Sequence, residues 1–339
     1  MKFISKYLKI IPVLFLVLGI TSCGDDDDGS TIPQTVVDAA VANGFTSLAA
    51  ALQATGLVDD LQAASNITVF APSNEAFDAL LTATGIDLAN MTVDEEALVT
   101  SILLNHVVTD GALNSTTIIN NGSGYVNTLA QGPGNNNLSL FYRVNNGVVE
   151  LNGGAGTDAG ANVTDVDIVA GNGIVHAIGK VLGLPTVVDM AIANPDFSSL
   201  VASLLEADGS TANPMYVSTL SGDGPFTVFA PNNAAFQALL DSNMMWNSPA
   251  DIDDTLLNAV LAHHVINAQN VQSGDLNQSG DTNPQTLQGD TITITLPGTN
   301  GNIADVTAGN GGDLGIIAVD VQANNGVIHV INAVMIPST

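Results

Sequence analysis

The chain has 339 residues and five histidines, two of which stand side by side in the segment "LAHHVI". Histidine is the side chain best suited to act as a base or as a metal ligand near neutral pH. Neighbouring residues are about 100° apart on a helix, however, and on a strand they point to opposite faces. The rings of His263 and His264 therefore diverge in either structure, and we do not expect the doublet to bind one metal ion.

The doublet lies in a repeated part of the chain. The segment "LLNAVLAHHVI" is matched upstream by "LVTSILLNHVV", an alignment that pairs His264 with His106 and His263 with Asn105. If the segment is a helix, His264 lies near the middle of its apolar arc and His263 at the edge. We therefore interpret His106 and His264 as buried or half-buried helix-end residues that are hydrogen-bonded to their neighbours.

The other two histidines also match each other. His176 in "NGIVH" and His329 in "NGVIH" occupy equivalent places in segments typical of strands, and we interpret them in the same structural way. If the fold brought one helix histidine and one strand histidine together, the pair would supply two ligands, fewer than a zinc site requires. The histidines predict neither a metal site nor a catalytic residue.

The sequence has no GxSxG elbow, HExxH pair, Walker loop or dinucleotide-binding glycine pattern. The segment "DLNQSGD" resembles the first half of a calcium loop, but Thr286 stands where a bidentate Glu is needed. We expect a polar turn there, with weak calcium binding as the alternative, and we predict no cofactor. The calcium candidates are Asp275, Asn277, Ser279 and Asp281.

Residues 1–22 have the features of an export signal, with three lysines before a short apolar run. The following Cys23 is the single cysteine of the chain, and the residues before it resemble the lipobox of bacterial lipoproteins. We expect Cys23 to carry a lipid; a secreted protein with one free thiol is the alternative. Without a second cysteine no disulfide can form within the chain, so the folded part depends on packing.

Residues 23–31 contain the acidic run "GDDDDGS", which predicts a solvated tether after the lipidated cysteine. Acidic runs at this place also resemble the surface-export signals of lipoproteins in Bacteroidetes-type bacteria. We therefore expect an exported, lipid-anchored protein of the outer membrane that is exposed on the cell surface.

The formal net charge is −28. Removal of residues 1–22 leaves two basic residues, Arg143 and Lys180, and all 33 carboxylates. The formal net charge of the mature chain is therefore 2 minus 33, or −31. A chain without a basic surface is not expected to bind nucleic acid. Contact with anionic lipid should likewise be limited to the acyl anchor.

Four sequence blocks occur twice in the same order, about 150 residues apart, which indicates two homologous domains rather than a short-period solenoid. We place them at residues 32–185 and 186–339, with almost no linker between them. Within each domain, a short run ending in "TVFAP" predicts a buried strand, and Ser73 or Asn232 just after it predicts a helix cap. Thr286–Leu296 alternates as a strand does, whereas residues 120–137 and 152–162 read as surface loops. The fold class is α+β.

The motifs "TVFAPxNxAF", the helix that ends in His-Val, "TLQG" and "NGxIHxI" resemble those of the fasciclin domain, which would be present twice and cover almost the whole mature chain. The resemblance implies a wedge or sandwich of strands against a helical layer, and a role in adhesion and extracellular interaction, usually without catalysis. Family members often have Tyr before the helix histidine, in a pair linked to receptor-dependent adhesion in animals. Asn105 and His263 stand there instead, which argues against receptor binding of the animal type.

Three functions remain open from the sequence. The first is a lipid-anchored adhesion or ligand-binding protein without catalysis, whose partner is an extracellular polysaccharide or protein. The second is a hydrolase or metal-dependent enzyme that uses the His and Asp residues. The third is a structural spacer on the cell surface.

Overall fold

The computed structural model describes residues 32–308 and 314–338. The expected signal peptide, Cys23 and the acidic tether lie outside this range. Within it, none of the helices combines the length and the apolar character that crossing a membrane would require.

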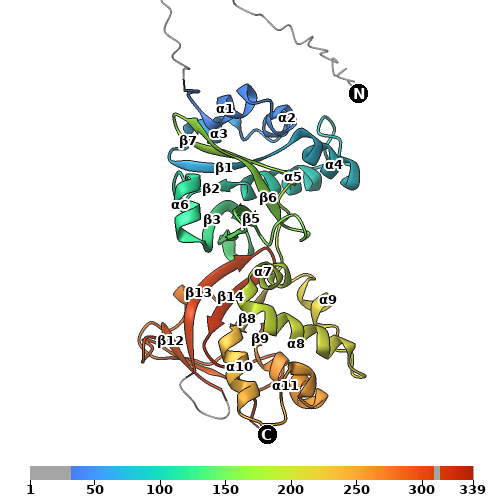
Figure 1. Cartoon of the computed structure of the whole chain (residues 1–339), viewed down its shortest axis with the longest axis vertical. Helices are drawn as coiled ribbons and strands as arrows, with labels where there is room; N and C mark the ends of the chain where they lie inside the picture. Colours follow the sequence, from blue (N-terminus) through green and yellow to red (C-terminus); the bar gives the residue numbers. More distant parts are fainter. Residues whose placement is uncertain (1–31, 309–313, 339) are drawn as a thin grey trace, which may run out of the picture. The chain divides into compact units, whose positions relative to one another are not determined.

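The first repeat begins with helices and ends with strands (Figure 1). Three short helices precede a buried strand, two longer helices follow it, and the remaining strands come after them with one further helix in between. The helices are α1 (Val36–Ala42), α2 (Thr46–Ala54), α3 (Val58–Ala63), α4 (Asn74–Thr84), α5 (Val93–Asn105) and α6 (Ser115–Asn121). The strands are β1 (Ile67–Pro72), β2 (Val107–Val108), β3 (Ser123–Gln131), β4 (Asn137–Asn145), β5 (Val148–Leu151), β6 (Ala161–Ala170) and β7 (Gly173–Ile178).

These seven strands form a closed barrel in which β1 pairs parallel to β7 and antiparallel to β2. Every residue of β1 is buried, because one face packs on the helical layer and the other faces the barrel interior. Val69 belongs to the core beneath the helices, and the adjacent Phe70 to the core inside the barrel. The alternation of side chains along one strand thus joins the two cores.

The second repeat has a similar order of elements, with a short 3-10 turn at Ser273–Asp275 in place of α6 (Figure 1). Its strands form one seven-stranded sheet in the order β10-β11-β12-β13-β14-β8-β9, with β8 parallel to β14. The helices are α7 (Val187–Ala193), α8 (Ser198–Gly209), α9 (Tyr216–Leu220), α10 (Asn233–Asp241) and α11 (Asp254–His263). The strands are β8 (Phe226–Pro231), β9 (Val265–Asn267), β10 (Asp281–Thr282), β11 (Thr293–Thr295), β12 (Ala304–Thr307), β13 (Gly315–Ala323) and β14 (Gly326–Ile331).

The predicted α+β class and the two tandem units are confirmed, as are the two buried strands that end in "FAP". The predicted helix caps are also confirmed. The Ser73 side chain accepts a hydrogen bond from the Ala76 amide at the start of α4, and Asn232 does the same for Ala235 at the start of α10. Such caps satisfy an amide that has no partner within the helix.

Two sequence-based predictions are wrong in part. Residues 120–137 are not one loop, because β3 occupies Ser123–Gln131 and turns Val126, Thr128 and Ala130 inward. Thr286–Leu296 is not one strand either, since only Thr293–Thr295 is extended in the sheet. The "TLQG" segment instead forms a turn, closed by a hydrogen bond from the Thr286 amide to the Asp290 carbonyl, with Gly289 at a φ of 113°. That backbone conformation favours glycine.

Candidate functional site

The two helix-end histidines make identical contacts in the two repeats. His106 Nδ1 lies 2.7 Å from the Ile102 carbonyl, and its Nε2 accepts a hydrogen bond from the Leu182 amide at 2.9 Å. His264 Nδ1 lies 2.7 Å from the Val260 carbonyl, and its Nε2 accepts from the Met335 amide at 2.9 Å. Each ring therefore carries its proton on Nδ1 and joins the end of a helix to the segment after the last strand.

Burial lowers the pKa of His106 and of His264 to about 4, although the carbonyl contact of each ring opposes the shift. Both imidazoles are neutral at pH 7, because the charged form would have to leave water. Their nitrogens are occupied by backbone partners, which leaves no free lone pair for a metal or for a substrate proton. The arrangement holds backbone segments together.

The residue before each of these histidines is buried as well. Asn105 Oδ1 accepts a hydrogen bond from Thr128 Oγ1 at 3.2 Å, and its Nδ2 donates to the Gly183 carbonyl at 2.8 Å. In the second repeat, His263 Nδ1 lies 3.3 Å from Oγ1 of Thr286, the residue equivalent to Thr128. Although the helical spacing puts His263 at the edge of the apolar arc, the residue is buried and only 1% exposed.

His263 differs from Asn105 in one respect. Its Nε2 is buried and has no hydrogen-bond partner within residues 32–308 and 314–338. Burial lowers the pKa of His263, and the nearby carboxylate of Asp290 opposes this shift. Asn105 and His263, which stand where members of the fasciclin family often have Tyr, are therefore buried in both repeats and do not form part of an exposed surface.

The strand histidines also match each other. His176 Nδ1 accepts from the Asp167 amide at 3.2 Å and its Nε2 lies 2.7 Å from the Leu113 carbonyl. His329 makes the corresponding contacts with Asp320 and Val271, at 3.4 and 2.8 Å. Both are neutral at pH 7, since burial lowers the pKa of each ring.

Two aspartates that the sequence interpretation missed lie beside these rings. Asp167 accepts hydrogen bonds from the amide and the hydroxyl of Ser115, at 2.8 and 2.5 Å. Asp320 binds Ser273 in the same way. Both aspartates have a φ of 60° and both precede the strand histidine by nine residues, a spacing that an alignment of the repeats could have detected.

This Ser-Asp-His set is not a catalytic triad. In a triad the histidine accepts the serine proton and the aspartate orients the histidine. Here the serine hydroxyl donates to the aspartate, while Nε2 of His176 faces the Leu113 carbonyl and Nδ1 accepts a backbone amide. These hydrogen bonds hold Ser115, at the start of α6, against the irregular part of β6 around Asp167.

Three of the four calcium candidates are engaged in local hydrogen bonds. Asp275 accepts from the Gln272 amide at 3.0 Å, Asn277 from the Ser279 amide at 3.3 Å, and Asp281 from Thr295 Oγ1 at 2.8 Å. These contacts belong to the polar turn and the short strand β10. Among the residues that the structure describes, no group of three or more His, Cys, Asp or Glu side chains is placed to hold a metal ion.

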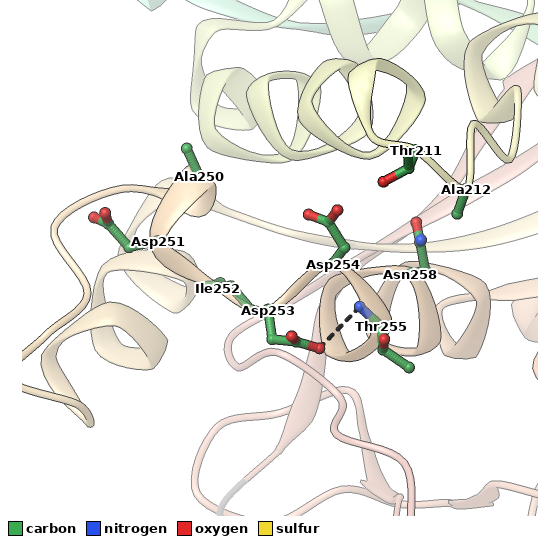
Figure 2. A pocket seen from close by; sticks show the side chains of 9 residues that line it. All are labelled: Thr211, Ala212, Ala250, Asp251, Ile252, Asp253, Asp254, Thr255 and Asn258. Carbon is green, nitrogen blue, oxygen red and sulfur yellow. Dashed lines mark hydrogen bonds between the residues drawn. The ribbon is translucent and has the colours of Figure 1, made fainter.

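An open pocket of about 740 Å³ lies between the end of α8 and the start of α11 (Figure 2). Asp251, Asp253 and Asp254 line it, together with Asn258, whose Oδ1 is buried and has no hydrogen-bond partner among the described residues. Asp253 is engaged as the cap of α11, and Asp251 accepts from the Asn247 and Ser248 amides. Figure 2 shows the Asp254 and Asn258 side chains directed toward Thr211 and Ala212.

The fasciclin domain model matches residues 43–185 and 196–337. The chain belongs to the fasciclin family. The two matches fall on the two repeats of the fold, and both sets of histidine and aspartate contacts lie within the matched residues.

Several fasciclin-family relatives resemble this chain. Protein sll1483 of Synechocystis is 35% identical over 156 residues, which cover 45% of this chain and 73% of that protein. Human periostin is 29% identical over 84% of this chain and 30% of its own length. The pig transforming growth factor-beta-induced protein ig-h3 is 28% identical over 83% of this chain and 36% of its own. The chain thus spans about a third of these two animal relatives.

A solved structure shares the fold of both repeats. It is a fasciclin domain pair from the insect cell adhesion molecule fasciclin I, with a TM-score of 0.54 and 22% identity, covering 86% of this chain and 97% of that structure. At this identity the likeness concerns the fold alone.

Proposed function

We propose that this protein is a lipid-anchored, extracytoplasmic adhesion or ligand-binding protein that acts through its two fasciclin domains without catalysis. The observation that carries the proposal is the pair of fasciclin domains, a domain type that occurs in an insect cell adhesion molecule. The ligand we propose is an extracellular polysaccharide or protein, bound through loops and not through the histidines.

The use of the histidines in the fold supports a role without catalysis. Four of the five rings have both nitrogens engaged with backbone groups, and the fifth, His263, is buried. A general base must reach the proton that it removes, and these nitrogens face the interior. The hydrolase alternative has no specific observation in its favour.

The proposed location rests on the sequence before residue 32. Its apolar run, lipobox-like residues and acidic tether support export, lipidation at Cys23 and display at the cell surface. Docking of the folded part onto anionic lipid is disfavoured, because residues 32–339 contain two basic side chains, Arg143 and Lys180.

The location is tested by labelling intact cells with an antibody against the folded part. The expected result is surface labelling that is lost in the Cys23→Ser variant, while the protein appears in the medium or the periplasm. A protein that fractionates with the cytoplasm would contradict the proposal.

The binding function is tested with the purified residues 32–339 on an array of polysaccharides and matrix proteins. We expect saturable binding to a defined subset of the array. Uniform failure to bind would instead favour a structural spacer.

A further inference from the structure

The first repeat has an apolar groove of about 300 Å³ between α4 and the segment that follows β7. Its walls are Leu80 and Ala83 of α4, Ile102 of α5, and Val181 and Gly183. Lys180 and Asp158 are the two charged residues that line it. The groove has the size at which small-molecule sites begin.

The second repeat has a groove at the equivalent place, and there the protein fills it. Leu239, Ser242, Val260 and Ile336 are the counterparts of Leu80, Ala83, Ile102 and Gly183 in the aligned repeats. Ile336 replaces a glycine, and Trp246 adds an indole ring with no counterpart in the first groove. The remaining space is about 70 Å³. The same fold therefore accepts apolar groups at this place, and the first repeat leaves the place open.

Lys180 gives the open groove a cation. Its Nζ donates a hydrogen bond to the Thr157 carbonyl at 2.5 Å, and it forms no ion pair within the described part of the chain. Arg143, the other basic residue in the described part of the chain, lies outside the groove and is paired with Glu150 at 2.6 Å. Asp158 is exposed to water, which screens its charge. In the second repeat the residue equivalent to Lys180 is Ala333, so the amine occurs only where the groove is open.

We propose that the groove of the first repeat binds an aliphatic carboxylate, with its hydrocarbon chain between Leu80 and Ile102 and its carboxylate on Lys180 Nζ. The apolar walls remove the chain from water, and the ammonium still has two protons to donate. An ammonium ligand would meet repulsion from Lys180. This site is independent of the proposed adhesion function, so the failure of either leaves the other standing.

The test is calorimetric titration of residues 32–339 with sodium decanoate, and in parallel with 1-decanol. We expect one decanoate per chain. Lys180→Met, which keeps the length of the side chain and removes its charge, should weaken decanoate binding at least about tenfold and leave 1-decanol binding within about twofold. The double variant Ala79→Leu and Ala83→Leu, at two exposed helix positions that line the groove, should abolish binding of both ligands without a change in melting temperature.

The matched control is Ala333→Lys in the second repeat. If the open groove is what binds, this variant still takes up one decanoate. Binding of two decanoates would show that an amine at this place suffices and would overturn the proposal. Absence of decanoate binding by the unmodified protein, or equal binding by Lys180→Met, would overturn it as well.

Discussion

At the scale of single residues, the adjacent histidines have different environments. His264 has both ring nitrogens hydrogen-bonded to the backbone, whereas His263 has a buried Nε2 without a partner in the described chain. The sequence predicted the helix-end place of His264, because only this histidine recurs in both repeats. It could not predict the burial of His263, since that depends on Thr286, which lies 23 residues further along the chain.

We expect His263→Asn to change the free energy of unfolding by less than about 1 kcal/mol. Asparagine stands at this place in the first repeat, and the substitution removes an unpaired buried nitrogen. His264→Asn should cost about 2 to 4 kcal/mol, because it breaks two buried hydrogen bonds and leaves a cavity. Urea unfolding of both variants measures the difference; similar losses would refute the distinction.

The buried histidines also predict a pH dependence. The pKa of His106 and His264 is about 4 in the folded protein, below the ordinary value of 6.5. Between pH 4 and pH 6.5 the unfolded chain therefore binds more protons than the folded protein. The contribution of the two histidines to the free energy of unfolding is full above pH 6.5 and is lost as the pH falls toward 4. It amounts to something on the order of 3 kcal/mol per histidine.

This dependence is measured by urea unfolding at pH 7 and pH 4.5. The carboxylates titrate as well, so the comparison is with His106→Gln, which lacks one of the two groups. The variant should lose less stability than the unmodified protein over this interval. An identical loss of unfolding free energy in both proteins would contradict the lowered pKa of His106.

At the scale of elements, the strands that hold the core were predictable and the irregular ones were not. β1 and β8 are marked by short runs of apolar residues with a single threonine in each, and the caps after them by Ser73 and Asn232. β3 was missed because Gly124 and its polar neighbours resemble a loop, although the alternate residues are buried. The link from Asp320 to Ser273 joins segments 47 residues apart, a contact that only the folded chain creates.

We expect Asp320→Asn to cost less than about 1 kcal/mol of unfolding free energy. Asparagine tolerates the φ of 60° and keeps one acceptor for the Ser273 amide. Asp320→Ala should cost about 2 kcal/mol, since it removes both hydrogen bonds and adapts poorly to that backbone. Asp167→Ala serves as the matched change in the first repeat. Equal losses for Asp320→Asn and Asp320→Ala would show that the hydrogen bonds contribute little.

At the scale of the whole molecule, charge is the dominant property. The formal net charge is −28, and the structure has one Arg–Glu ion pair among its described residues. Such an excess of carboxylates repels itself, and salt screens the repulsion. The composition predicted this property fully, because it does not depend on the fold.

We expect the melting temperature to rise as NaCl increases from about 0.05 to 0.5 M, where the screening length falls to a few ångströms. Calcium chloride at matched ionic strength should add a gradual effect without saturation, because Asp275 and Asp281 already accept hydrogen bonds in separate local contacts. A saturable rise that disappears in Asp275→Ala would establish the calcium site that the sequence left open.

Within residues 186–308 and 314–338, the strands of the second repeat form an open sheet that ends at β9 and β10. Open sheet ends expose unpaired backbone groups and invite neighbouring chains to pair with them. Both ends are blunted here. The Leu287 amide already donates to the Val265 carbonyl of β9, and β10 has two residues, one of them Asp281. Both ends of this sheet are therefore poor templates for fibre-like pairing with another chain.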